Sequence, residues 1–174
     1  PNNVYSPFWQ VAPRFPRSVN QDAFQIPGWQ EVFEAMTKAD TIVLSEAVIY
    51  GGPADNPYQW PQRFISAPIH ETLERGSKIV AVHSAVLPWH NYFYNIVPPG
   101  VCCLSVVVKN TCQQVFTYAV SGQDVAYVGP EDLHDRRYSH MELSADFDAL
   151  EELNGTDTCR YSLYVYPTQE FHET

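Results

Sequence analysis

The side chains best suited to catalysis or metal binding lie in one short stretch near the middle of the C-terminal half. Its carboxylate oxygens and imidazole nitrogens could in principle hold a metal ion. Their spacing fits no defined metal site, so we predict no metal here and expect a turn in which Asp132 or Asp135 caps backbone N–H groups. The candidate side chains are Glu131, Asp132, His134, Asp135 and His140.

Motifs that would indicate catalysis are absent from the sequence. It has no Gly-x-Ser-x-Gly nucleophile elbow, no Gly-x-x-x-x-Gly-Lys phosphate loop and no Gly-x-Gly-x-x-Gly dinucleotide motif. The sequence shows no catalytic nucleophile together with a general base to activate it. A secreted hydrolase is therefore only a distant alternative. We therefore expect a chain without enzymatic activity of its own and without a cofactor.

The charge balance narrows the classes of partner. The chain has 174 residues, with 20 acidic against 10 basic side chains and a net charge of −10. Nucleic acid and anionic lipid both require a basic surface, so neither is expected as a partner. A cationic, zwitterionic or neutral small molecule fits better. No apolar run is long enough to cross a bilayer, so we expect membrane attachment only through segments outside this chain.

The cysteine usage points to an oxidising environment. The four cysteines include no Cys-x-x-Cys pair, which argues against a zinc site and a redox motif. An even cysteine count, together with the sequon Asn154-Gly155-Thr156, favours the secretory pathway. Asn154 is accordingly a candidate glycosylation site. The expected location is extracellular or at the cell surface.

The elements of the N-terminal half can be read from hydrophobic spacing and turn residues. Apolar residues at helical spacing predict a helix over Trp29–Ala39, and a short strand follows at residues 41–45. Residues 64–72 and 78–88 read as a β-hairpin. Because both faces of its second strand are apolar, we predict a central strand with layers on either side. A short helix is expected over residues 89–96.

In the C-terminal half, three β segments at residues 104–109, 114–120 and 124–128 predict a meander. A strand is expected around residues 138–143, a helix over 144–153 capped by Ser144, and a final strand at 160–166 that returns to pair with the meander. Hairpins dominate over helical crossovers. The predicted fold class is α/β (α+β), with a mostly antiparallel twisted sheet flanked by short helices and a C-terminal β-meander.

Several aromatic and histidine side chains admit two interpretations. Trp9 and Gln10 lie in an extended proline-rich segment that either wraps over the domain or forms the wall of a ligand pocket. His70 and His83 lie on predicted strands, where each is either bonded inside the fold or in contact with a ligand. The aromatic-rich loop beginning at residue 51 should fold back as a lid or flap.

Four sequence words together resemble a known family: Asn110-Thr111-Cys112, Phe116-Thr117-Tyr118, Leu133-His134-Asp135 and the run from Cys159 to Pro167. They are similar to short sequence motifs in the extracellular region of receptor-type nucleotide (guanylate or adenylate) cyclases of diatoms and related algae. Words in the N-terminal half, such as Phe8-Trp9-Gln10, fall in comparable places. The resemblance implies a sensor domain of the Cache or CHASE kind with a PAS-like sheet, whose cyclase active site would lie in a separate cytoplasmic domain.

The same resemblance implies a disulfide between Cys112 and Cys159 that ties a turn of the meander to the last strand. Cys102 and Cys103 are then left over, and their adjacency departs from the family pattern. Adjacent cysteines rarely bridge each other, so they are expected as buried thiols or as partners of chain beyond this fragment.

The leading hypothesis is an extracellular sensor that binds a small molecule and passes a shape change to its membrane-linked ends. We assign residues 1–100 to a PAS-like sensing half and 101–174 to a disulfide-linked meander half, with a homodimer as an option. The alternative is a cell-surface or secreted protein-interaction or structural module without a small ligand. The predicted ligand-binding residues are Trp9, Gln10, Tyr50, His70, His83 and Trp89.

Overall fold

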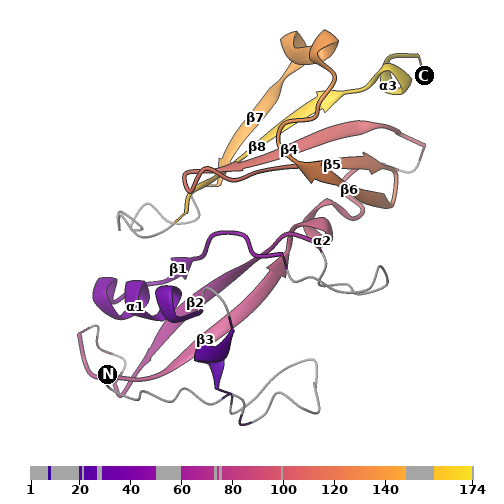
Figure 1. The fold of residues 1–174 in the computed structure, drawn as a ribbon. Helices are drawn as coiled ribbons and strands as arrows, with labels where there is room; N and C mark the ends of the chain where they lie inside the picture. The colour runs from indigo at the N-terminus through magenta and orange to yellow at the C-terminus, as the bar shows by residue number, and fades with distance from the viewer. Residues whose placement is uncertain are drawn as a thin grey trace.

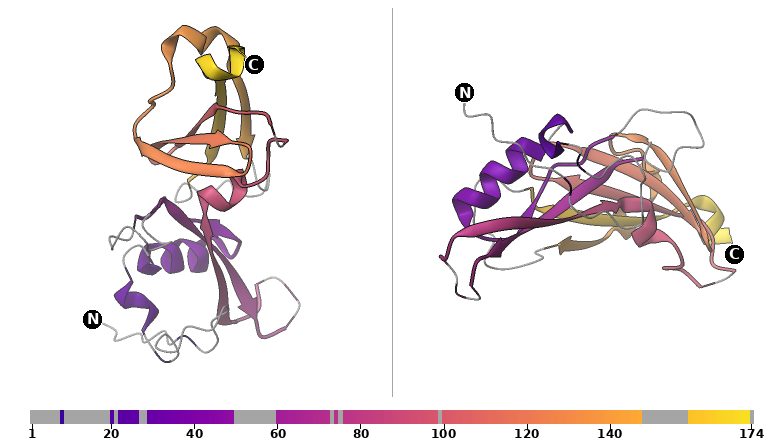
Figure 2. Two further views of the ribbon diagram at one scale, coloured as in Figure 1. Left: turned by 90° about the vertical axis from the view of Figure 1, so that its right-hand side faces the viewer. Right: turned by 90° about the horizontal axis from the view of Figure 1, so that it is seen from below.

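A computed structural model describes residues 8, 20, 22–26, 29–49, 60–72, 74, 76–98, 100–147 and 159–173. Two β-sheets lie one above the other, with a short helix between them (Figures 1 and 2). In chain order the elements are η1 (Ala23–Gln25), α1 (Trp29–Ala39), β1 (Val43–Leu44), β2 (Gln62–His70), β3 (Ile79–Pro88), α2 (Trp89–Phe93), β4 (Leu104–Asn110), β5 (Val115–Ser121), β6 (Asp124–Pro130), η2 (Arg136–Met141), β7 (Leu143–Phe147), β8 (Tyr161–Pro167) and α3 (Gln169–Glu173). Among the described helices, none has the length and apolar character to cross a membrane.

The first sheet has three antiparallel strands in the order β1-β2-β3. Helix α1 packs against it and buries Trp29, Val32 and Met36, which recur at helical spacing. The Trp29 ring contacts Phe64 of β2, with 4.8 Å between the ring centroids. The predicted helix and hairpin are both confirmed.

Strand β3 corrects one expectation. It pairs only with β2 among the described residues, so it lies at an edge of the sheet and is not a central strand. Val80 is 54% exposed and Val86 is 41% exposed. Valine suits any extended backbone, so apolar residues on both faces of a strand did not require a layer on each side.

The second sheet has five antiparallel strands in the order β6-β5-β4-β8-β7. The predicted meander forms β4, β5 and β6, and the last strand returns to pair with β4, as expected. The Cys112–Cys159 disulfide is present, with the two Cα atoms 5.6 Å apart. The mixed α and β fold class with mostly antiparallel sheets is confirmed.

Two expectations in the segment before β8 are wrong. Residues 136–141 form the 3₁₀ helix η2 and not a strand, while Leu143–Phe147 form β7 and not the start of a helix. Strand β7 pairs along β8, and the Ser162 hydroxyl donates to the Asp146 carboxylate at 2.6 Å. Backbone pairing with a distant strand outweighed the local capping signal at Ser144. Residues 148–158 lie outside the described residues.

The two sheets share a buried junction. Trp89 and Phe93 of α2 join the core cluster formed by β4, β5 and β8. The Arg63 guanidinium lies over the rings of Trp89 and Tyr161, at 4.4 and 5.0 Å from their centroids. The Tyr161 hydroxyl donates to the Ser45 carbonyl at 2.8 Å. Aromatic packing and hydrogen bonds therefore connect the halves.

Candidate functional site

A groove of about 490 Å³ opens at one end of the five-stranded sheet. This end of the sheet is the one nearest α3 (Figure 1). The start of β4, the end of β5, the start of β6 and the end of β8 meet there, because neighbouring antiparallel strands run in opposite directions. The groove is lined by Cys103, Leu104, Ala119, Val120, Ser121, Asp124, Ala126, Asp135, Thr168, Gln169 and Glu170. Its volume falls in the range of small-molecule sites.

The lining of the groove combines apolar side chains with carboxylates. Ala119 and Ala126 face each other across β5 and β6, which gives part of the wall a small apolar surface. Asp124 and Glu170 add carboxylates, and both side chains belong to exposed residues. Asp135 is different, because Arg137 pairs with its carboxylate at 2.6 Å. The groove can therefore hold a small molecule that carries positive charge next to a short hydrocarbon segment.

Two free thiols lie at one side of this groove. The sulfurs of Cys102 and Cys103 and a carboxylate oxygen of Glu170 all lie within 4.8 Å of one another. Hydrogen bonds with Cys102 and Glu170 raise the pKa of the Cys103 thiol to about 12. The sequence expectation of buried thiols is corrected, since both residues are partly exposed.

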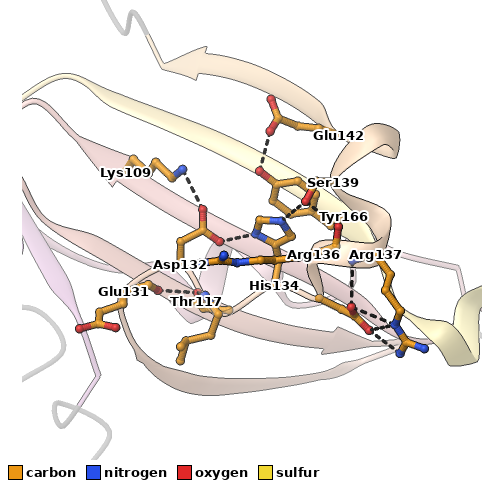
Figure 3. Close-up of polar contacts among 12 residues, drawn as sticks. Lys109, Thr117, Glu131, Asp132, His134, Arg136, Arg137, Ser139, Glu142 and Tyr166 are labelled. Carbon is orange, nitrogen blue, oxygen red and sulfur yellow. Dashed lines mark hydrogen bonds and ion pairs between the residues drawn. The ribbon is translucent and has the colours of Figure 1, made fainter.

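A second polar site, the His134 cluster, covers the outer face of the same sheet (Figure 3). The His134 ring stacks on Tyr166 with centroids 3.7 Å apart. Its Nδ1 is hydrogen-bonded to the Asp132 carboxylate, and its Nε2 lies 2.8 Å from the Ser139 hydroxyl oxygen. The second carboxylate oxygen of Asp132 accepts from the Lys109 ammonium at 2.8 Å.

The prediction of a turn in which Asp132 or Asp135 caps backbone N–H groups is confirmed for Asp135. Asp135 is the N-cap of η2, and its carboxylate accepts from the Arg137 backbone N–H at 3.0 Å. The buried Thr117 hydroxyl donates to the Glu131 carbonyl and accepts from the Leu133 N–H. These bonds anchor the loop between β6 and η2 on the sheet.

The order Asp132, His134, Ser139 has the connectivity of a serine nucleophile relay, which sequence spacing did not reveal. The Ser139 hydroxyl also lies 3.0 Å from the Arg136 carbonyl, to which it can donate its single proton. Neither His134 nor Ser139 lines the groove. We interpret the cluster as the anchor of the loop rather than as a nucleophilic site.

The charge of Asp132 makes this anchor sensitive to acid. Partial burial alone would raise the pKa of Asp132, but hydrogen bonds and charge attraction from Lys109 and His134 hold it below its usual value. A carboxyl group with a lowered pKa stabilises the fold above its unfolded pKa of about 4, and this stabilisation is lost as the pH falls through the folded value.

Asp132→Asn is therefore expected to lower the free energy of unfolding at pH 7 by about 1.5–3 kcal/mol, the usual range for hydrogen bonds to charged groups. The difference from the wild type should shrink below about pH 4, where the wild-type carboxyl also becomes neutral. Urea unfolding at pH 7 and pH 3 measures this, with Glu71→Gln as an exposed control. A deficit that does not change with pH would contradict the assignment.

Three of the predicted ligand-binding residues, His70, His83 and Trp89, are described by the structure, and none of these three lines the groove. Trp9, Gln10 and Tyr50 lie outside the described residues, as does the sequon residue Asn154. His70 is bonded inside the fold, with Nδ1 2.9 Å from the Ser77 carbonyl of its own hairpin and Nε2 3.1 Å from the carboxylate of Asp40, which follows α1. His83 is exposed on β3. Trp89 is fully buried in the junction.

Sequence reasoning missed the groove because its parts are distant in the chain. The sequence marks Cys103 only as a thiol without a disulfide partner, and nothing in it places Glu170 nearby. The one available signal was the pairing of the last strand with the meander, which brings the residues after β8 to the start of β4.

Comparisons with family models, with curated proteins and with solved structures found no match. The disulfide is typical of proteins that fold in an oxidising, non-cytoplasmic compartment.

Proposed function

We propose that the chain is an extracellular sensor domain and that the groove binds a small amine-bearing molecule. The single observation that carries the proposal is the groove itself, about 490 Å³ in volume, with carboxylates beside an apolar wall. Such a combination of apolar surface and a few placed polar groups is typical of small-molecule sites.

The sign of the ligand charge follows from the carboxylates. Asp124 and Glu170 face the groove, and the chain as a whole has a net charge of −10. A protonated amine would form charge-assisted hydrogen bonds with these oxygens, whereas an anionic ligand would be repelled. Leu104 and Ala119 would contact the hydrocarbon part of the ligand.

The receptor part of the proposal has two supports. The disulfide fits an extracellular domain, and the sequence words resemble the sensor region of receptor-type nucleotide cyclases. A sensor must couple its ligand site to the rest of the protein. The β4–β8 pair would supply this coupling, because it extends from the groove to the core around Trp89 and Tyr161.

The test is binding of amines to the purified chain. A thermal-shift screen across amines, amino acids, purines and organic acids, followed by calorimetric titration of the hits, should give stabilisation by amines alone. Asp124→Asn should weaken binding of the best amine about 10- to 100-fold, because one charge-assisted hydrogen bond is lost. Glu71→Gln removes an equal charge elsewhere and should leave binding unchanged. Equal effects of both variants, or no amine that binds, would overturn the proposal.

One observation favours the alternative, an interaction module without a small ligand. The hairpin exposes Ile69, Val80 and Val86, and β3 is an edge strand of the described sheet. Exposed edges of this kind pair with added strands from partners. A negative amine screen would make this edge the better candidate for recognition.

A further inference from the structure

Three metal-ligating groups converge beside the groove from two distant segments. Cys102 and Cys103 precede β4, and Glu170 lies in α3 after β8. Their sulfur and oxygen atoms all lie within 4.8 Å of one another. We infer that these three side chains bind a thiophilic divalent cation of the zinc class.

The backbone around Cys103 presents both sulfurs to one place. Successive side chains of a regular strand point to opposite faces, so adjacent cysteines would normally diverge. Cys103 has a φ of +76°, a left-handed conformation that is uncommon for a residue with a side chain. This turn of the chain just before β4 departs from strand geometry and allows the two thiols to approach the same carboxylate. Strained backbone of this kind is concentrated at functional sites.

Hydrogen bonds hold the turn from both neighbouring segments. The Cys103 N–H donates to the Val120 carbonyl at 3.2 Å. Its carbonyl accepts from the Thr168 N–H at 3.0 Å and from the Thr168 hydroxyl at 2.6 Å. The two hydrogen bonds from Thr168 also fix the start of α3, and Glu170 lies two residues after Thr168. The cysteines and the carboxylate are therefore positioned by the same contacts.

The donor set selects the cation. Two thiolates and one carboxylate suit Zn²⁺, whereas Mg²⁺ and Ca²⁺ prefer oxygen ligands alone. With Zn–S bonds of about 2.3 Å, a tetrahedral site places its two sulfurs about 3.8 Å apart. The sulfurs and the carboxylate oxygen lie within 4.8 Å of one another, so the separations need to shorten by at most about 1–1.3 Å to reach tetrahedral distances, which side-chain rotation can supply. The fourth position would be open to water or to a ligand in the groove.

Zinc binding involves no change of oxidation state, so it needs no oxidant or reductant. Zn²⁺ displaces the protons of the two thiols and forms two Zn–S bonds and one Zn–O bond, so two protons are released to solvent. The site and the bound ion together then carry a single negative charge. This site goes beyond the amine site. The two sites share Glu170, but the zinc site does not use Asp124 and the amine site does not use the thiols.

The experiment measures Zn²⁺ binding to the purified chain, recovered from an oxidising secretory host without added reductant. Competition with a chromophoric zinc indicator should give one ion per chain, and Co²⁺ in its place should show thiolate-to-cobalt absorption. Loss of a group that only supports a metal ligand typically weakens metal binding about 10- to 100-fold. Loss of a ligand itself should have at least that effect, so we expect Cys102→Ser and Cys103→Ser each to weaken Zn²⁺ binding at least about 100-fold, and Glu170→Gln about 10-fold. Glu71→Gln removes an exposed carboxylate outside the groove and should bind Zn²⁺ as the wild type does.

Three outcomes would overturn the inference. The first is no indicator competition by a protein whose two thiols react with a thiol reagent. The second is unchanged affinity in the Cys102→Ser, Cys103→Ser double variant, which would place the ion elsewhere. The third is a Cys102–Cys103 disulfide found by mass spectrometry in the protein as recovered. The amine screen is read separately, so Zn²⁺ binding without amine binding, or the reverse, identifies which proposal fails.

Discussion

Replacing both Cys112 and Cys159 by serine is expected to lower the free energy of unfolding by about 4 kcal/mol. The disulfide closes a loop with a sequence separation of 47, and the chain-entropy model gives this cost for opening such a loop. Domains are stable by only about 5–15 kcal/mol, so a large part of the total would be lost. Urea unfolding of the double variant against the wild type measures the difference.

The natural control is the Cys102→Ser variant, which removes a thiol that forms no disulfide in the structure, compared in metal-free buffer so that no bound ion contributes. It should unfold at nearly the wild-type urea concentration. A double variant at Cys112 and Cys159 that loses less than about 1 kcal/mol would mean that the unfolded chain is already restrained without the bond.

Arg63→Ala is expected to cost about 3 kcal/mol, because a buried side chain is lost from the junction between the sheets. Arg63 is only 4% exposed, and its guanidinium lies 4.4 Å from the centre of the Trp89 ring. A desolvated cation over an aromatic ring contributes about 2 kcal/mol, and the missing hydrocarbon stem leaves a cavity beside Trp89 and Tyr161.

Two further variants isolate the cause. Arg63→Lys keeps the charge but loses the planar stack on the rings, so it should recover only part of the stability. Arg137→Ala removes an exposed arginine that pairs with Asp135 in solvent, and it should leave the free energy of unfolding nearly unchanged. Urea unfolding of all three variants is the measurement. If Arg63→Ala and Arg137→Ala had equal effects, the junction would not depend on the buried cation.

Elements whose signals are local could be predicted from the sequence. The spacing of Trp29, Val32 and Met36 defined α1, and turn residues such as Gly122 separated the strands of the meander. Strand β7 could not be predicted in the same way, because Ser144 and Asp146 also satisfy the rules for a helix start. Only the pairing with β8 decides between the two outcomes, and that pairing is not visible locally.

The candidate site was harder still to predict. The groove depends on the register between β4 and β8, on the left-handed turn at Cys103 and on the position of Glu170. None of these has a sequence period or motif. The prediction that the second hairpin strand is a central strand rested on apolar residues on both of its faces, and the edge position of β3 in the described sheet contradicts it. The disulfide pairing came from the family resemblance and not from spacing.

The position of β8 between β4 and β7 has a consequence for biosynthesis. During synthesis the meander leaves the ribosome before β8, so one side of β4 has no hydrogen-bonding partner until the last strand is made. Folding that waits for such distant contacts is slow, and unpaired strand edges promote aggregation in the meantime. The Cys112–Cys159 bond can close only after this wait. Completion of the domain is therefore expected to follow, rather than accompany, its translation.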